Sequence, residues 1–454
     1  MSTIDISIVV VYLIATLLIG LWQSKSIKSM KDYTIAERNY STFVIVATVA
    51  ASWFGGGTSI GKVEKIFNHG TVYLLTTVGL VVQLLLMSEF LVKKFEPYMG
   101  LLTIGDIMEK MYGKKAKIIT GLFGTIISVS FLGSQIAALG YFMTTIFDIS
   151  MLTAVIVSYG TVIIYSSFGG IRSVAITDVF QFIIIVVMIP TVVYLTFRNY
   201  GLTSSFVELI PRTKLNFTDI SHDNYKYFYM MLVFTVPTLI PMSIQRILMS
   251  RDVQQSRQSF RWSIIILLIV SGSMTSIALL ATITMPEVNA NQVIPVMIRD
   301  LMPIGIKGLV VAGFLAIIMS SADSFLHSSG VCITHDLLKP ILKKSLPVKK
   351  ELLLTKVLTF TIGGLSIVTA IHTDSLVETI HRGFGFWMPA VLVPLIAGLL
   401  KLKKDKTAYY MSVIAGTSSV FLCMYLDVVN AGVTLIALLS SLVAYCIFGR
   451  RTAK

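Results

Sequence analysis

Long apolar runs dominate this chain, and short polar stretches separate them at regular intervals. Each run is about 20 residues long or slightly longer, which lets a helix cross the roughly 30 Å of hydrocarbon in a membrane. The pattern predicts an all-α polytopic membrane protein with about 13 transmembrane helices, forming one membrane domain over residues 1–454. The helices are expected near residues 5–24, 42–66, 71–93, 117–146, 150–168, 171–198, 227–248, 261–285, 305–333, 352–372, 377–400, 407–427 and 430–448.

Two of these segments are expected to be interrupted. Three successive glycines at 55–57 free the backbone of the second segment to unwind, and Pro237 and Pro241 remove amide donors from the seventh. The interruptions lie five segments apart, which predicts two repeats. These repeats would cover 42–198 and 227–400, with peripheral helices at 5–24 and 407–448. Such matched interruptions indicate a transporter's binding site near the middle of the membrane. In the alternative, the glycines only permit close packing and the prolines only kink the helix.

A polar run at 320–324 stands inside the apolar stretch 308–332. On a helix, Ser320, Asp323 and Ser324 share one face, because residues three and four positions apart lie above one another. Hydroxyls and a carboxylate at membrane depth favour a hard cation, and a buried charge there is expected to have a partner and a function. The alternative is a serine-rich helix contact in which Asp323 reaches toward water.

The chain is 55% hydrophobic and only 13% charged, yet its formal net charge is +14. The basic residues concentrate in alternate connections, which indicates membrane topology and not a nucleic-acid partner. The basic segments are 25–38, 93–117, 246–261, 339–350, 401–406 and 450–454. By the positive-inside rule they are cytoplasmic, so the N-terminus and residues 199–226 are expected outside and the C-terminus inside. The protein is expected in the plasma membrane, with the lipid bilayer as a partner.

The first apolar segment is expected to be a retained helix, since no basic residue precedes it and no cleavage site follows it. Cys332, Cys423 and Cys446 all fall in apolar segments, which predicts neither a disulfide framework nor a metal motif. The chain has no recognisable nucleophile–base pair or nucleotide loop, so we expect neither an enzyme nor an organic cofactor.

Four stretches together resemble the sodium:solute symporter family. They are residues 51–56, 169–181, 245–248 and 319–324. The resemblance extends from about residue 5 to 400 and implies an inverted five-plus-five helix repeat of the leucine-transporter type. It also implies a site for Na⁺ as the coupling ion, built from the backbone carbonyls of Ala51, Phe54 and Ile317 and the hydroxyls of Ser320 and Ser321.

Some members of the family have a second ion site, which by resemblance would involve Asp178, Asp323 and Ser324. This chain places a carboxylate at Asp323, where a hydroxyl is common. Two carboxylates near one ion would bind it more tightly or would share a proton, and both alternatives remain open. Asp178 also lies close in sequence to Arg172, and it could instead belong to an ion pair at the cytoplasmic gate.

The stretches look most like the choline-transporter branch, which implies an aromatic cage for a quaternary ammonium group. Trp53 is in place, and Phe131 stands where that branch has a tryptophan. Ile240 replaces another tryptophan of that branch, so the cage is incomplete.

Other residues point to a different solute. His381 matches roughly the position from which sugar-transporting relatives contact substrate, and Arg382 beside it would suit a carboxylate. In the alternative, both lie at the outer interface in contact with water. Thr58 and Gln83 are polar enough to line a central cavity, although each could equally join two helices.

The resemblance implies a sodium-coupled symporter that takes up a small polar organic solute, such as an amino acid, a carboxylate or an amine, by alternating access. The alternatives are a membrane sensor or channel on the same scaffold and a proton-coupled symporter. No oligomer is implied.

Overall fold

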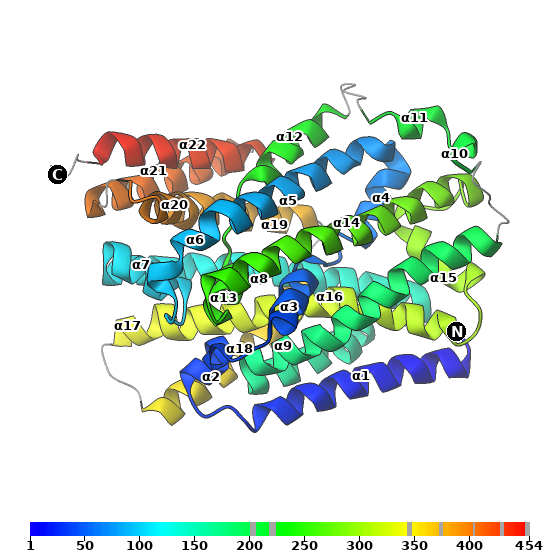
Figure 1. Cartoon of the computed structure of the whole chain (residues 1–454), viewed down its shortest axis with the longest axis horizontal. Coiled ribbons are helices and arrows are strands. Elements are labelled where there is room, and N and C mark those ends of the chain that lie inside the picture. Colours follow the sequence, from blue (N-terminus) through cyan, green and yellow to red (C-terminus); the bar gives the residue numbers. More distant parts are fainter. Residues whose placement is uncertain are drawn as a thin grey trace.

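The computed structural model describes residues 1–199, 206–217, 224–342, 347–371, 376–402, 405–426 and 431–449. Every regular element in these ranges is helical, and the long helices run side by side (Figure 1). The longer helices are α1 (Thr3–Ser24), α5 (Leu74–Leu86), α8 (Lys114–Phe147), α9 (Met151–Asn199), α14 (Val253–Thr284), α16 (Ile306–Val331), α18 (Val348–Ile371), α21 (Lys406–Tyr425) and α22 (Ala431–Phe448).

Shorter helices connect or extend these. They are α2 (Met30–Ile35), α3 (Thr42–Trp53), α4 (Ile60–His69), α6 (Val92–Lys94), α7 (Ile104–Tyr112), α10 (Phe206–Leu209), α11 (Arg212–Leu215), α12 (Tyr225–Thr235), α13 (Pro241–Met249), α15 (Val293–Leu301), α17 (Lys339–Leu342), α19 (Leu376–Trp387) and α20 (Val393–Leu399). Wider, π-helical turns continue three of the helices: η3 (Met87–Leu91), η6 (Cys332–Leu338) and η7 (Met388–Leu392). The 3₁₀ turns are η1 (Ala36–Arg38), η2 (Gly70–Tyr73), η4 (Glu96–Tyr98) and η5 (Ala290–Gln292).

The all-helical class expected from the apolar pattern is confirmed. Within the described ranges, 8 helical segments are long and apolar enough to cross a membrane, and three shorter apolar helices accompany them. The count of 13 spans and the inverted repeat remain predictions.

Both expected interruptions are present. α3 ends at Trp53 and α4 begins at Ile60, so the glycine-rich stretch between them is not helical. α12 ends at Thr235, and Pro241 opens α13 at a position where a missing amide donor costs nothing. Between them Leu239 has a φ of 37°, which only a well-packed backbone sustains for a residue with a side chain.

One boundary differs from the expectation. The helices expected at 150–168 and 171–198 form the single element α9, which kinks at Gly170 with φ 52° and ψ −150°. A Cβ on Gly170 would lie 2.5 Å from the ring of Tyr33, so the kink and the close approach of α2 both require glycine.

α16 is the central helix of the molecule. Its apolar window is 94% buried, against 28–56% for the other candidate spans. It packs against α9, α8, α1 and α18, and it runs on through η6 into α17. Every residue of the polar run 320–324 is accordingly buried, with at most 2% of its surface exposed.

The described parts of the basic segments lie together at one end of the molecule, called here the basic end, where α2, α7, α17 and the end of α22 are found (Figure 1). The N-terminus, α10, α11 and α15 lie at the opposite end. One residue departs from the charge pattern. Arg246 was expected with the basic connection 246–261, but its side chain is only 1% exposed and lies in the core.

Candidate ion and solute site

The first interrupted helix brings backbone carbonyls against two hydroxyls of α16. The Ser320 hydroxyl lies 3.1 Å from the carbonyl oxygen of Ala51 and 3.0 Å from that of Ile317. The Ser321 hydroxyl donates to the carbonyl of Phe54. The carbonyls of Ala51 and Phe54 are available to α16 because α3 stops at Trp53, and the last carbonyls of a helix lack the usual helical partner four residues on. The structure thus brings together all five residues that the resemblance assigns to sodium, and all are buried.

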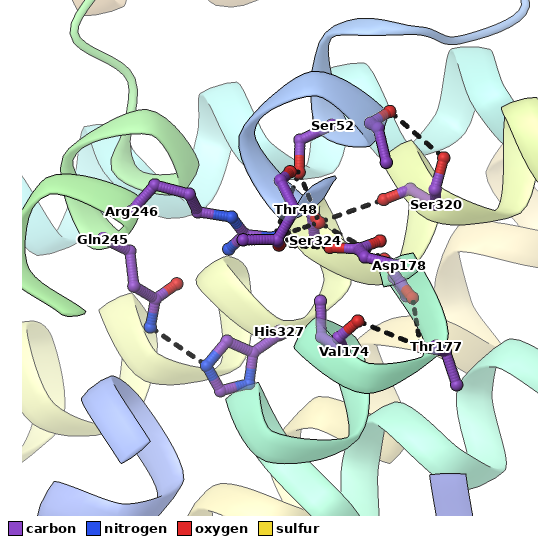
Figure 2. A network of polar contacts seen from close by, with 12 residues as sticks. Thr48, Ser52, Val174, Thr177, Asp178, Gln245, Arg246, Ser320, Ser324 and His327 are labelled. Atoms are coloured by element: carbon purple, nitrogen blue, oxygen red, sulfur yellow. Dashed lines mark hydrogen bonds and ion pairs between the residues drawn. The ribbon is translucent and has the colours of Figure 1, made fainter. Parts of the chain in front are cut away.

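Arg246 reaches from α13 toward α3, α9 and α16, as Figure 2 shows. Its Nη2 donates to Ser324 Oγ at 2.6 Å, to Ser52 Oγ at 3.1 Å and to Asp178 Oδ2 at 3.3 Å. The same carboxylate oxygen of Asp178 accepts a hydrogen bond from Thr48. One guanidinium therefore connects both expected repeats, and it lies against a carboxylate that was expected to serve an ion.

Asp323 is the second buried carboxylate of this network, and its hydrogen-bond partners are neutral. The Tyr165 hydroxyl donates to Oδ2 at 2.7 Å, and the Thr177 hydroxyl lies 3.4 Å from the same oxygen. Ser324 donates to Oδ1 at 3.2 Å. Asp323 is 0% exposed, so the alternative in which it reaches toward water is wrong.

The charges of this network do not cancel when both carboxylates are ionised. Asp178 and Asp323 then contribute −1 each and Arg246 contributes +1, which leaves a net charge of −1 among side chains that are at most 1% exposed. An uncompensated charge at this depth is costly, by several kcal/mol even after relaxation. The cluster therefore favours binding one further positive charge.

Arg172 has a different partner from the one considered. Its Nη2 lies 2.8 Å from Asp32 Oδ1 on α2, so a gate pair between Arg172 and Asp178 is wrong. Burial of Asp32 acts to raise its pKa, but hydrogen bonds from the Lys28 amide, from Ser29 and from Arg172 outweigh this and hold the pKa below its usual value. The pair ties α2 to the kinked part of α9 at the basic end.

Gln245 and His327 form a neutral pair beside Arg246 (Figure 2). Gln245 Nε2 lies 3.0 Å from His327 Nε2, and the same amide donates to the Thr34 carbonyl at 2.8 Å. A small cavity adjoins Gln245. It is lined by Leu102, Thr103, Ile104, Pro241, Gln245, Ser328, Val331 and Cys332. Gln245 on α13 and Ser328 on α16 therefore border a cavity that Ile104 of α7 also lines.

The expected cage residues are not stacked on one another. The Phe131 ring lies 4.6 Å from the Phe325 ring, nearly parallel to it, and meets Phe384 edge-on at 5.2 Å. Trp53 is half-buried at the end of α3, and Ile240 is buried just before α13. Among the described ring contacts none joins Trp53 to Phe131, so these two rings do not contact each other and a ligand would have to lie between them to form an aromatic cage.

Gln83 makes an interhelical contact, the alternative role that the sequence analysis gave it. Its amide donates to the Val236 carbonyl at 2.6 Å and lies 3.3 Å from Thr238 Oγ1. The Trp387 indole N–H donates to the Thr238 carbonyl at 3.0 Å. Both side chains thus satisfy backbone carbonyls that the second interruption leaves without helical partners.

Side chains satisfy the first interruption in the same way. Gln135 on α8 accepts a hydrogen bond from the Gly56 amide at 2.8 Å. Thr58 accepts from the Gly55 amide at 2.9 Å and lies 3.3 Å from the Trp53 carbonyl. Thr58 and Gln83 therefore hold the interrupted backbone in place, whatever contact they make with a solute.

The side chain of His381 lies outside the described residues, as does that of Arg382, although their backbone belongs to α19.

The residues that the sequence analysis missed are Arg246, Thr48, Tyr165 and Thr177. An arginine adjoining an interrupted apolar segment was a usable signal, since charge at membrane depth is rare. The positive-inside pattern assigned it to a connection instead.

A second charged cluster lies at the basic end, where Asp106, His335 and Asp336 place their ligand atoms within 4.8 Å of one another. Protein groups already bond to them. Lys117 contacts Asp106, His335 lies 3.2 Å from Asp106 Oδ1 and 3.1 Å from Glu351 Oε1, and Thr103 donates to Asp336 at 2.6 Å. The cluster joins α7, α8, η6 and α18.

Comparison with known proteins places these features in context. A profile of the sodium:solute symporter family matches residues 33–416. The high-affinity choline transporter 1 of Drosophila melanogaster is 24% identical over 433 residues, which cover 89% of this chain and 68% of that protein. The sodium/glucose cotransporter of Vibrio parahaemolyticus is 25% identical over 396 residues, which cover 75% and 69%. The chain thus aligns with about two thirds of the length of each.

The fold is also found among solved structures. A Na⁺-coupled sialic acid symporter in a substrate-bound, outward-open state superposes with a TM-score of 0.84 at 18% identity, over 98% of this chain and 97% of that one. This likeness establishes a shared helical arrangement.

The charge balance of the network generates a prediction. Arg246→Met removes the cation and leaves Asp178 buried without one, which should destabilise the protein by about 3–5 kcal/mol. Adding Asp178→Asn restores the wild-type net charge, so the double variant should recover most of that loss. The melting temperatures of the purified proteins measure both effects.

Arg172→Met is the matched control, because it breaks an ion pair whose arginine is 26% exposed and should cost less. A double variant as unstable as Arg246→Met alone would contradict the charge balance.

Proposed function

The chain belongs to the sodium:solute symporter family, and from that premise we propose that it is a sodium-coupled symporter that takes up a small polar organic solute by alternating access. The solute classes that fit are an amino acid, a carboxylate or an amine. Sodium moving down its gradient supplies the driving force.

The contact between α16 and the end of α3 is the observation that supports this proposal. Ser320 and Ser321 lie against carbonyl oxygens of Ala51, Phe54 and Ile317, without a formal charge in the set. Sodium is a hard cation that prefers such oxygen ligands. The site joins the two expected repeats, so the ion stabilises one arrangement of α3 against α16, as ion coupling requires.

Asp178, Asp323 and Ser324 form the proposed coupling site beside it. Because Arg246 matches the charge of Asp178, the charge of Asp323 remains for a mobile cation. A second sodium or a proton would each supply it, and the all-hydroxyl surroundings of Asp323 suit either. A proton-coupled symporter is therefore the second candidate function.

The proposed solute site lies between Trp53, Phe131 and Ile240, with Thr58, Gln83 and His381 at its margin. Trp53 and Phe131 offer ring faces to an amine. Thr58 and Gln83 bond to the interrupted backbone. A solute that contacts these side chains would therefore change the shape of that backbone and, through it, the ion site.

We further propose 13 membrane spans in an inverted five-plus-five repeat, with the basic end in the cytoplasm and the protein in the plasma membrane.

The rival function is a sensor or channel on this scaffold. Uptake into proteoliposomes distinguishes them, because only a symporter accumulates solute against its gradient when a sodium gradient is applied. A solute panel screened by sodium-dependent thermal stabilisation identifies the substrate to use.

Sodium affinity should depend on the two hydroxyls of α16. The Ser320→Ala/Ser321→Ala variant should need at least about 10-fold more sodium for half-maximal stabilisation, the effect of losing about 1.4 kcal/mol. The measurement is a thermal titration in which sodium replaces N-methylglucamine at constant chloride. Ser329→Ala is the control, since that hydroxyl only donates to the Leu326 carbonyl of the same helix. An unchanged titration in a folded double variant would remove the site assignment.

Asp323→Asn keeps the shape of the side chain and removes its charge. If a second sodium binds there, the wild type should show a sigmoidal sodium titration that becomes hyperbolic in the variant. If a proton binds, the apparent sodium affinity of the wild type should vary with pH, and the variant should flatten that profile. A variant that keeps the wild-type sodium and pH dependence while changing solute preference would assign Asp323 to the solute instead.

Orientation is tested by labelling intact cells with a membrane-impermeant thiol reagent. A cysteine introduced by Asn216→Cys should react, whereas one introduced by Lys349→Cys should react only after permeabilisation, because basic segments face the cytoplasm. The opposite pattern would invert the proposed topology.

A further inference from the structure

Lys62 is a buried lysine whose side-chain partners among the described residues are two hydroxyls. It lies on α4, directly after the first interruption, and is 5% exposed. Its ammonium donates to Thr77 Oγ1 on α5 at 2.6 Å and contacts Ser271 Oγ on α14. Among the described residues no carboxylate forms an ion pair with it, whereas Lys65 on the same helix pairs with Glu64 at 3.0 Å.

The two hydroxyls around Lys62 are also unusual. Hydroxyls on helices in apolar surroundings commonly donate to a carbonyl one turn earlier, as Thr275 does to Ser271 at 2.8 Å on α14. Thr77 and Ser271 instead lie 3.3 Å from each other and have no bond to a carbonyl of their own helix. Both are buried, at 7% and 6% exposure.

A count of hydrogens shows a surplus of donors. A lysine ammonium has three N–H donors and no acceptor, and each hydroxyl has one donor. Two N–H groups use the two hydroxyl oxygens, and one hydroxyl donates to the other. With the amine protonated, one N–H and one O–H are left over beside its positive charge. Buried charge and unsatisfied donors are both costly, and a small anion removes both costs at once.

We propose that Lys62, Thr77 and Ser271 form a binding site for a small monovalent inorganic anion of the chloride type. The anion accepts hydrogen bonds from all three groups and takes the place of the direct contact between Lys62 and Ser271. Bound there, it cancels the charge of Lys62 and connects α4 to α5 and α14, of which α14 packs against both other helices. The site is separate from the sodium-binding residues and does not depend on the identity of the solute.

The test measures chloride binding to the purified full-length protein. At constant sodium, chloride replacing gluconate should raise the melting temperature of the wild type in a saturable way, and radioactive chloride should bind at equilibrium. Lys62→Met should lose both responses. Lys65→Met, three residues along the same helix and 39% exposed, should keep them.

Ser271→Ala and Thr77→Val leave the lysine in place and should each weaken chloride binding about tenfold, as expected for the loss of one hydrogen bond to an ion. If Lys62→Met does not fold, it loses sodium-dependent stabilisation at constant chloride, and the two hydroxyl variants then provide the test instead. The alternative is a neutral amine that accepts a hydrogen bond from one hydroxyl. In that case the wild type binds no more chloride than Lys62→Met, and the proposal is overturned.

Discussion

The ion pair between the Arg246 guanidinium and Asp178 of α9 is the interaction on which the centre of this molecule depends. In surroundings without water, an ion pair is stable only if its geometry is good and its remaining polar atoms are bonded. Here Thr48, Ser52 and Ser324 supply hydroxyls to Asp178 Oδ2 and Arg246 Nη2 from two further helices, whereas Asp178 Oδ1 and Arg246 Nε and Nη1 have no hydrogen-bond partner among the described residues. The guanidinium therefore fixes how α13 lies against α3 and α16.

When both carboxylates are ionised, Arg246 balances only one of them, and the remaining negative charge has a functional consequence. Asp323 receives hydrogen bonds from neutral hydroxyls only, so its charge is available to a cation that enters and leaves. A fully compensated cluster would hold the helices together but would not respond to an ion. One buried carboxylate in excess lets the packing of α16 depend on whether a cation is bound.

The interrupted helices impose a second constraint, because irregular backbone inside a membrane must have its polar groups bonded. Gln135 bonds to Gly56, and Gln83 and Trp387 bond to the second interruption. Since these side chains come from neighbouring helices, the shape of each interruption depends on where those helices lie. A movement of α8 is therefore transmitted to the first interruption, whose carbonyls face Ser320 and Ser321, and a movement of α5 to the second interruption.

Much of this arrangement follows from patterns within single segments. Apolar runs, three glycines and two prolines predicted the helices and both interruptions, because these features depend on residues a few positions apart. The polar run 320–324 likewise pointed to α16, and a resemblance in motif identified the oxygens that meet there. The charge pattern placed Arg246 in a connection, because the positive-inside rule counts basic residues and does not distinguish a side chain at the end of a connection from one that points into the core.

By itself, then, the sequence determined the helical class, the two breaks and the hydroxyl face of α16, all of which rest on local backbone preferences and periodicity. Only the tertiary structure decided that Arg246 faces Asp178, 68 residues away, that Gln83 bonds to Val236, 153 residues away, and that Lys62 meets Ser271, 209 residues away. Each of these contacts crosses between helices, and helix packing sets it through the combined shape of many side chains that no single segment contains.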